Sequence, residues 1–226
     1  MPYKQTSNKN GQSTVAVVKV LIWIASLAAG YFLVHEIKQR WSEQRSLDKA
    51  GAIANKTFDE LRDAAAKNHP DQSIAIAVQQ EAIKRSEVEL AKETGDNKSD
   101  AAAGQFLGFY LVNMRARSDY CKALGLDISP FTSAFERNHA SLYIKSRLIN
   151  SRGPFAPDRL ESEMYKQLLP TFEKTIADEM RATASELKVT EADVCKLLSS
   201  NGEELAVSMQ LSTVNPALSR AMIEAR

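Results

Sequence analysis

The stretch DAAAGQFLGFYLVNMRARSDYCKAL, Asp100–Leu124, decides the fold class of this chain. Apolar residues recur there every three or four positions, at Leu107, Tyr110, Leu111, Met114, Cys121 and Leu124. Charged residues occupy the positions between them, which is the spacing of one buried stripe along an α-helix. Cys121 belongs to that stripe, so we expect its thiol to face the core of a helical domain.

The helical pattern extends from this stretch in both directions. The chain is rich in Ala, Leu, Glu, Lys, Arg and Gln, which form helices well, and has only 9 Gly and 7 Pro in 226 residues. The apolar alternation of residues 74–78 continues into residues 79–85 without a turn, which favours a helix over a strand by length. The sequence therefore predicts an irregular all-α domain of six to eight helices.

Capping residues and chain breakers place the expected ends of the first helices. Thr57 and Glu60 have the spacing of a capping box, which predicts a helix start there. His69-Pro70 ends that helix, because the residue before a proline avoids the helical conformation. The next helix is expected over residues 72–93, with a loop at Gly95-Asp96-Asn97 before the central helix.

The later helices are placed in the same way. Ser129-Pro130 has the residue types of an N-cap and a first helical position. Pro170 is expected to kink or split the helix that begins at Asp158. A short helix over residues 190–200, ended by an Asn-Gly pair, and a last one from Asn215-Pro216 complete the domain.

The chain has only two cysteines, Cys121 and Cys195, both on apolar helix faces. An even count is typical of a structural disulfide in an oxidising compartment. Joining them closes a loop of about 75 residues and stabilises the fold by about 4 kcal/mol. Two unrelated buried thiols, which pack as small apolar side chains, are the alternative. We favour the disulfide.

A second informative stretch is the apolar run VAVVKVLIWIASLAAGYFLV, Val15–Val34. Its twenty residues would extend about 30 Å as a helix, the thickness of the hydrocarbon core of a bilayer. Lys19 lies near one edge, from where its long side chain reaches the headgroups. The run is longer than the core of a cleaved signal peptide, and an apolar segment follows the small residues 28–30. The sequence predicts an uncleaved transmembrane signal-anchor helix in contact with membrane lipid; a cleaved signal and a buried soluble helix are the alternatives.

This run divides the chain into four parts. Residues 1–14 are expected to be a flexible polar tail, 15–34 the span, 35–56 a juxtamembrane helix or linker, and 57–226 the α-helical domain. Trp41, flanked by charges, fits the membrane interface, although packing on the domain explains it nearly as well. Ser26 and Gly30 are four residues apart, which would let two spans approach closely in a homodimer.

Two signals disagree on which side of the membrane the domain lies. Four basic residues between 38 and 49 follow the span, which favours a cytoplasmic domain by the positive-inside rule. The paired cysteines favour an extracytoplasmic one. Lys4, Lys9 and Lys19 are the only charged residues before residue 35, which leaves 26 basic and 28 acidic residues after it. We favour a single-pass inner (plasma) membrane protein with a periplasmic or otherwise extracytoplasmic domain.

The chain shows no motif of known chemistry. His35, His69 and His139 are far apart and have no second ligand at helical spacing, so we expect no metal site, cofactor or catalytic residue. His139 interrupts an apolar helix, and we expect it to be satisfied by neighbouring backbone or solvent rather than to face a groove. Nucleic acid is not an expected partner, because basic and acidic residues are interleaved in a slightly acidic domain.

Three hypotheses on function remain. The preferred one is a membrane-anchored helical protein that acts as a protein-interaction or structural component of a bacterial cell envelope, with protein partners there. A second is an envelope enzyme that acts on a glycan through a carboxylate in a groove. A third is a membrane-tethered adaptor in the cytoplasm, based on the basic residues after the span.

Overall fold

The structure, a computed structural model, describes residues 44–153 and 155–225. The predictions that fall on residues 1–43 lie outside this part: the tail 1–14, the span 15–34, the start of the linker 35–56, the homodimer contact of Ser26 and Gly30, and the interface residues Lys19 and Trp41. In the two described segments, no helix has both the length and the apolar character needed to cross a membrane.

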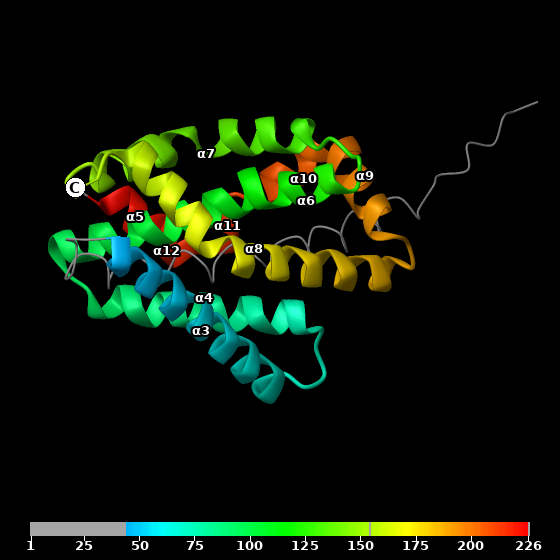
Figure 1. Cartoon of the computed structure of the whole chain (residues 1–226), viewed down its shortest axis with the longest axis horizontal. Helices are drawn as coiled ribbons and strands as arrows, with labels where there is room; N and C mark the ends of the chain where they lie inside the picture. The colour runs from blue at the N-terminus through cyan, green and yellow to red at the C-terminus, as the bar shows by residue number, and fades with distance from the viewer. Residues whose placement is uncertain (1–43, 154, 226) are drawn as a thin grey trace, which may run out of the picture.

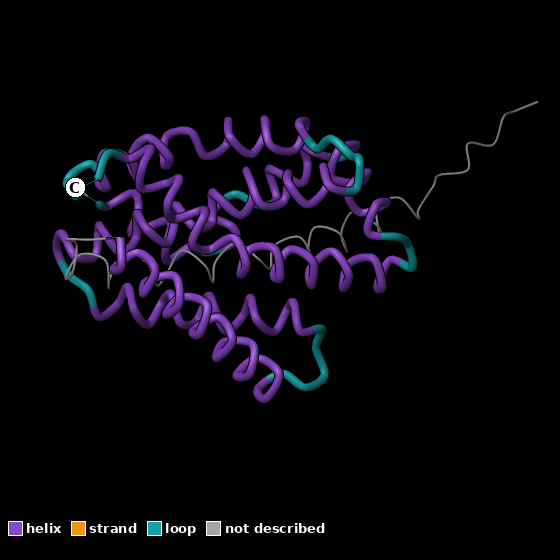
Figure 2. Tube along the Cα trace, viewed as in Figure 1, coloured by secondary structure: helices purple, strands orange, loops and turns teal. Residues whose placement is uncertain are grey.

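The described residues form helices joined by loops and contain no strand (Figures 1 and 2), so the all-α class is confirmed. The helices are α3 (Gln44–Asn68), α4 (Ile74–Lys92), α5 (Gly95–Leu111), α6 (Arg117–Ala123), α7 (Ser129–Asn150), α8 (Pro157–Leu187), α9 (Glu191–Ser200), α10 (Gly202–Ser208), α11 (Leu211–Val214) and α12 (Pro216–Glu224). A π-helical segment, η1 (Val112–Ala116), joins α5 to α6. With α5, η1 and α6 counted as one continuous helix, this part of the chain has nine helices, against six to eight expected. The difference arises because residues 202–214 form two short helices.

Two expected boundaries in the first half of the chain are wrong. The helix α3 runs through Thr57 without a break, and the Thr57 hydroxyl donates a hydrogen bond to the Ile53 carbonyl one turn earlier, which is helix-interior geometry. The helix α5 begins at Gly95, where a loop was expected. Gly95 has a φ of 55°, a conformation that glycine adopts readily, so the chain reverses between Lys92 and Gly95 and enters α5 directly.

One later boundary also differs from expectation, whereas the structure at Pro170 is one of the two expected outcomes. Ser129 is the first residue of α7 rather than its N-cap; the Asp127 carboxylate accepts hydrogen bonds from the Ser129 backbone N–H (2.9 Å) and hydroxyl (2.7 Å). Of the kink or split expected at Pro170, the structure has the kink: α8 runs continuously from Pro157 to Leu187. Figure 1 shows α8 changing direction near its middle, which is where a proline removes a backbone hydrogen bond.

The core forms around α5, whose residues 102–111 are all buried. Aromatic side chains from α5 and α7 pack there, with ring centroids 5.3 Å apart for Phe109 and Phe135 and 4.3 Å apart for Tyr110 and Tyr143. The start of α10 closes against the start of α7 at Gly202, where an added Cβ would lie 2.4 Å from the Phe131 backbone nitrogen. Only glycine allows this approach.

The hairpin of α3 and α4 lies along α8 (Figure 1). Three polar pairs connect α3 to α8 in the same order along both helices: Asn55 with Thr171, Asp59 with Lys174, and Arg62 with Asp178. The two helices therefore run in the same direction. Phe58, Leu61 and Ala65 of α3 are buried beside these pairs.

The disulfide prediction is confirmed. Cys121 of α6 and Cys195 of α9 are joined, with Cα atoms 5.7 Å apart and a separation of 74 positions in the sequence. Both residues are completely buried. The bond therefore connects the end of the central helix to the C-terminal third of the domain.

Candidate binding groove

The ends of α4 and α12 and the beginning of α5 enclose an open groove. It has two parts, of about 380 Å³ and about 250 Å³, which share Lys98, Ala221 and Glu224. We call this the α5–α12 groove; its lining residues are Glu87, Leu90, Ala91, Gly95, Asp96, Lys98, Ser99, Ala217, Arg220, Ala221, Glu224 and Ala225.

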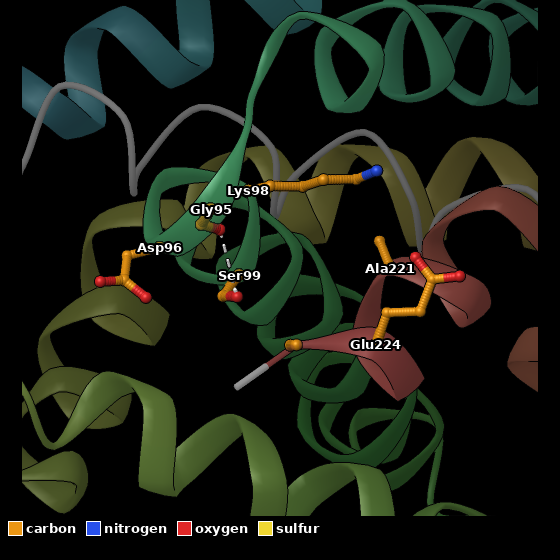
Figure 3. A pocket seen from close by; sticks show the side chains of 7 residues that line it. Gly95, Asp96, Lys98, Ser99, Ala221 and Glu224 are labelled. Carbon is orange, nitrogen blue, oxygen red and sulfur yellow. Dashed lines mark hydrogen bonds between the residues drawn. The ribbon is translucent and has the colours of Figure 1, made fainter.

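The α5 side of the groove consists of the first turn of that helix. No side chain caps α5 at Thr94, so the backbone N–H groups of the first turn are not satisfied by an N-cap. Figure 3 shows the Lys98 side chain extending across the groove toward the side on which Glu224 lies, whereas the Asp96 carboxylate points the other way. The Asp96 carboxylate lies 3.5 Å from the guanidinium of Arg152, which follows the end of α7.

The α12 side of the groove is held in place by buried hydrogen bonds to α4 and α5. The Asn215 side chain caps α12 by accepting a hydrogen bond from the Leu218 N–H (2.9 Å), and its amide donates to the Ser86 hydroxyl (3.1 Å). That hydroxyl donates to Gln105 (2.6 Å). Asn215, Ser86 and Gln105 are all buried, so this chain of hydrogen bonds fixes α12 to both α4 and α5.

The groove is lined by small apolar side chains and by charged ones. Ala91, Ala217 and Ala221 are among its lining residues, together with the charged residues Glu87, Lys98, Arg220 and Glu224. A groove open to solvent on this scale leaves most of a small ligand exposed, whereas small-molecule sites usually enclose theirs. Lys98 and Arg220 are placed to bind carboxylates, and Glu224 and Glu87 to bind basic groups.

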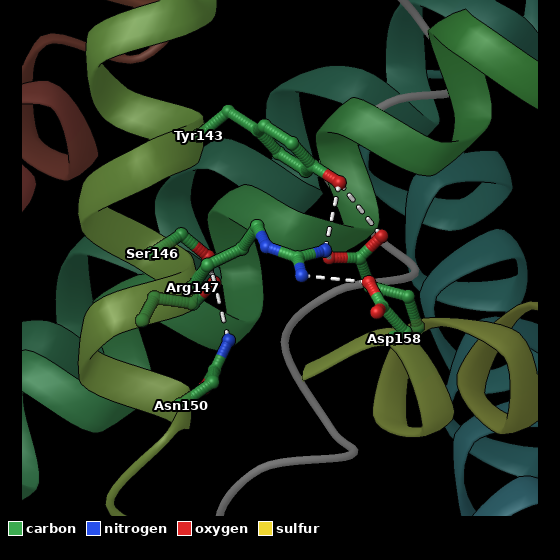
Figure 4. Close-up of polar contacts among 7 residues, drawn as sticks. Tyr143, Ser146, Arg147, Asn150 and Asp158 are labelled. Atoms are coloured by element: carbon green, nitrogen blue, oxygen red, sulfur yellow. Dashed lines mark hydrogen bonds and ion pairs between the residues drawn. The ribbon is translucent and has the colours of Figure 1, made fainter. Parts of the chain in front are cut away.

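The connection between α7 and α8, close to Arg152, is fixed by a polar cluster (Figure 4). The Arg147 guanidinium donates to Glu161 (2.8 Å) and to Asp158 (2.6 Å), and the Tyr143 hydroxyl donates to Glu161 (2.8 Å). Burial and the adjacent Glu161 carboxylate raise the pKa of Tyr143, so its hydroxyl stays protonated and remains a donor. The cluster holds the beginning of α8 against α7.

A second polar site is completely buried. The Arg117 guanidinium donates to both carboxylate oxygens of Glu179 on α8, and its Nε donates to the Asn113 side-chain oxygen (3.3 Å). Asn113 lies in the π-helical segment, and its amide donates to the Phe109 carbonyl (2.9 Å). Arg117 and Glu179 are both 0% exposed, so no ligand reaches them from solvent in this conformation.

His139 has the structural role that the sequence favours. It is 1% exposed; its Nδ1 lies 2.9 Å from the Phe135 carbonyl, and its Nε2 accepts a hydrogen bond from the Leu211 N–H (3.2 Å). These partners require the neutral ring with the proton on Nδ1. Burial lowers the pKa of His139, which keeps it in that form. His139 connects α7 to the start of α11 and does not line the groove.

The structure therefore joins the predicted Cys121 and Cys195, and it places the α5–α12 groove on other elements. The sequence reasoning missed the groove, because it treated Gly95-Asp96-Asn97 as a loop and did not place the last helix against it. The Asn-Pro pair at 215–216 is the one signal that marks the beginning of α12, but nothing in it indicates where that helix packs.

Within residues 44–153 and 155–225, no group of three or more His, Cys, Asp or Glu side chains is arranged to hold a metal ion. No protein-family model, curated protein or solved structure matches this chain.

Proposed function

We propose that this protein is a membrane-anchored module of a bacterial cell envelope whose extracytoplasmic helical domain binds a protein partner through the α5–α12 groove. The apolar run of residues 15–34 is the anchor. The observation that carries the proposal is the groove, since its small alanine side chains and its charges of both signs suit a polypeptide segment.

The compartment is supported by the Cys121–Cys195 bond. Structural disulfides persist outside the cytoplasm and are rare inside it. This argument outweighs the basic residues that follow the span. It is tested by a maleimide–polymer gel shift on the full-length protein in intact cells. Two shifts that need prior reduction support an extracytoplasmic domain; shifts after denaturation alone contradict it and favour the cytoplasmic adaptor.

The groove is tested by site-specific photo-crosslinking in living cells. A photo-reactive amino acid at position 98 or 224 is expected to give the same adduct, because both side chains line the shared part of the groove. The control is position 186, which is exposed near the far end of α8. We expect a crosslinked partner when the probe is at position 98 or 224, and no crosslinked partner when it is at position 186.

Reversing the charge of Glu224 distinguishes specific binding of a partner in the groove from crosslinking by random contact. Glu224→Lys, with the probe at position 98, is expected to abolish the adduct, because it replaces the carboxylate that receives a basic group of the partner. Glu186→Lys is the matched control and should leave the adduct unchanged. An adduct that is equally strong at all three positions, or that survives Glu224→Lys, contradicts the proposal.

A glycan-active enzyme is the second candidate, because the carboxylates Glu224 and Glu87 both line the groove. Glycoside hydrolysis uses two carboxylates on either side of the bond. Hydrolysis of purified cell-wall glycan by the full-length protein, lost in Glu224→Gln, would replace the binding proposal by this one.

A further inference from the structure

Three exposed apolar side chains gather at one end of the domain. Ile144 and Leu148 are 60% and 65% exposed on the outer face of α7, one turn apart, and Ile223 of α12 is 64% exposed. The Lys145 ammonium donates a hydrogen bond to the Ile223 carbonyl (2.6 Å), which places the end of α12 beside this part of α7. We call Ile144, Leu148 and Ile223 the α7–α12 patch.

The patch lies at the end of the molecule where the chain enters α3. The helices α3 and α4 form an antiparallel hairpin, so the beginning of α3 lies beside the end of α4. Two residues after α4 the chain begins α5, and the first turn of α5 shares a cavity with Glu224 and Ala225, next to Ile223. Figure 1 shows the start of α3, the start of α5 and the C-terminal end of α12 at the same end of the domain.

The length of chain before α3 limits how far this end lies from the membrane. This step rests on the proposed anchor at residues 15–34. Nine residues, 35–43, separate Val34 from the first residue of α3. Fully extended, they span about 30 Å, and as a helix about 14 Å. The end that carries the α7–α12 patch is therefore the end held near the headgroups.

We propose that the α7–α12 patch inserts its apolar side chains into the surface of the lipid bilayer that anchors the chain. Exposed branched aliphatic side chains are costly in water, and the headgroup–acyl boundary is the apolar phase within reach. The exposed Lys145 ammonium, which donates to the Ile223 carbonyl beside the patch, supplies a positive charge for lipid phosphates.

A second copy of the chain fits the patch less well than lipid. Three side chains at these exposures offer on the order of 400 Å², half of the about 800 Å² that each partner contributes to a stable protein interface. Contact with the bilayer needs no such area. The anchor already holds the domain at the membrane surface, so the contact of the patch is intramolecular and loses little translational and rotational entropy.

The test uses the full-length protein with one added cysteine that carries an environment-sensitive fluorophore. Cys121 and Cys195 are joined and buried, so the label reacts only at the added site. Leu148→Cys and Ile223→Cys report on the patch. Val207→Cys is the matched control: it is also an exposed aliphatic residue, 52% accessible, but lies on α10, which packs against the opposite end of α7.

The labelled proteins are reconstituted into phosphatidylcholine–phosphatidylglycerol vesicles at less than one protein per vesicle, with and without lipids that carry a nitroxide at the headgroup. We expect blue-shifted emission and quenching at positions 148 and 223, and neither at 207. The double substitution Ile144→Ser/Ile223→Ser, with the label at 148, should reduce the quenching severalfold, because it removes the rest of the apolar contact.

The two proposals fail in different ways. Protein that does not float with the vesicles refutes the anchor and hence the proposed function. Protein that floats, but whose labels at 148 and 223 behave like the label at 207, refutes the lipid contact alone. A signal that appears only at high protein density assigns the patch to a second copy and also overturns the lipid contact.

Discussion

The buried pair of Arg117 and Glu179 offers a quantitative test of what holds the domain together. Glu179→Gln keeps the shape of the side chain but removes its charge, and it leaves an arginine that is 0% exposed without its counter-ion. Glu179 accepts two charge-assisted hydrogen bonds from the guanidinium, each worth about 1.5–3 kcal/mol. Breaking one partner of such a pair costs about 3–5 kcal/mol, because the remaining charge stays buried.

Urea unfolding of the full-length protein in detergent, followed by circular dichroism at 222 nm, measures this loss. With a slope of about 2 kcal/mol/M, a loss of about 4 kcal/mol moves the midpoint down by about 2 M. Replacing both members by methionine is expected to restore most of the stability, since two apolar side chains of similar size need no counter-ion.

The surface pair of Arg137 and Glu203 supplies the control. Its side chains are 60% and 74% exposed, so Glu203→Gln should leave the midpoint almost unchanged. The reasoning is refuted if Glu179→Gln shifts the midpoint no more than Glu203→Gln does, or if the double methionine variant is less stable than Glu179→Gln alone.

Three further predictions concern stability. Reducing the Cys121–Cys195 bond is expected to lower the free energy of unfolding by about 4 kcal/mol, measured by urea unfolding with and without reductant; an unchanged midpoint would contradict the loop-closure argument. Because burial holds the pKa of His139 below its usual 6.5, the unfolded chain binds the proton more readily, so stability is full above pH 6.5 and falls as the pH drops below it. His139→Gln should flatten that part of the pH profile measured by thermal unfolding, and an unaltered slope would assign it to other groups. Gly202→Ala should destabilise by about 1–3 kcal/mol, because its Cβ would meet the Phe131 backbone nitrogen at 2.4 Å; thermal unfolding at or above the wild-type midpoint would show that α10 can move aside.

Features that depend on residues close in sequence could be predicted. Periodicity and capping predict the all-α class, the central helix and the end of α9 before Gly202. The cysteine count, together with the apolar face that carries Cys121, predicts the disulfide. The break expected at Thr57 is wrong because a capping-box spacing also occurs inside helices, where packing of Phe58 and Leu61 against the core decides the outcome.

Features that depend on long-range packing could not be predicted. Arg117 and Glu179 look like surface charges in the sequence, and only the packing of α8 against the central helix, 62 residues later, buries them together. The α5–α12 groove has the same origin: Lys98 and Glu224 are 126 positions apart in the sequence, and no local pattern indicates that they lie close together.

The π-helical segment η1 has a consequence for the phase of the central helix. Phe109, Asn113, Arg117 and Cys121 are spaced by four residues and are all buried, although in a regular α-helix such a row rotates by about 40° at every step. A π turn closes over one additional residue and so takes up most of this accumulated rotation. Deleting one residue of η1 would rotate everything after it by about 100°, turning Arg117 away from its carboxylate and the sulfur of Cys121 away from its partner in one step. The ion pair and the disulfide thus share a single determinant, the number of residues in that turn.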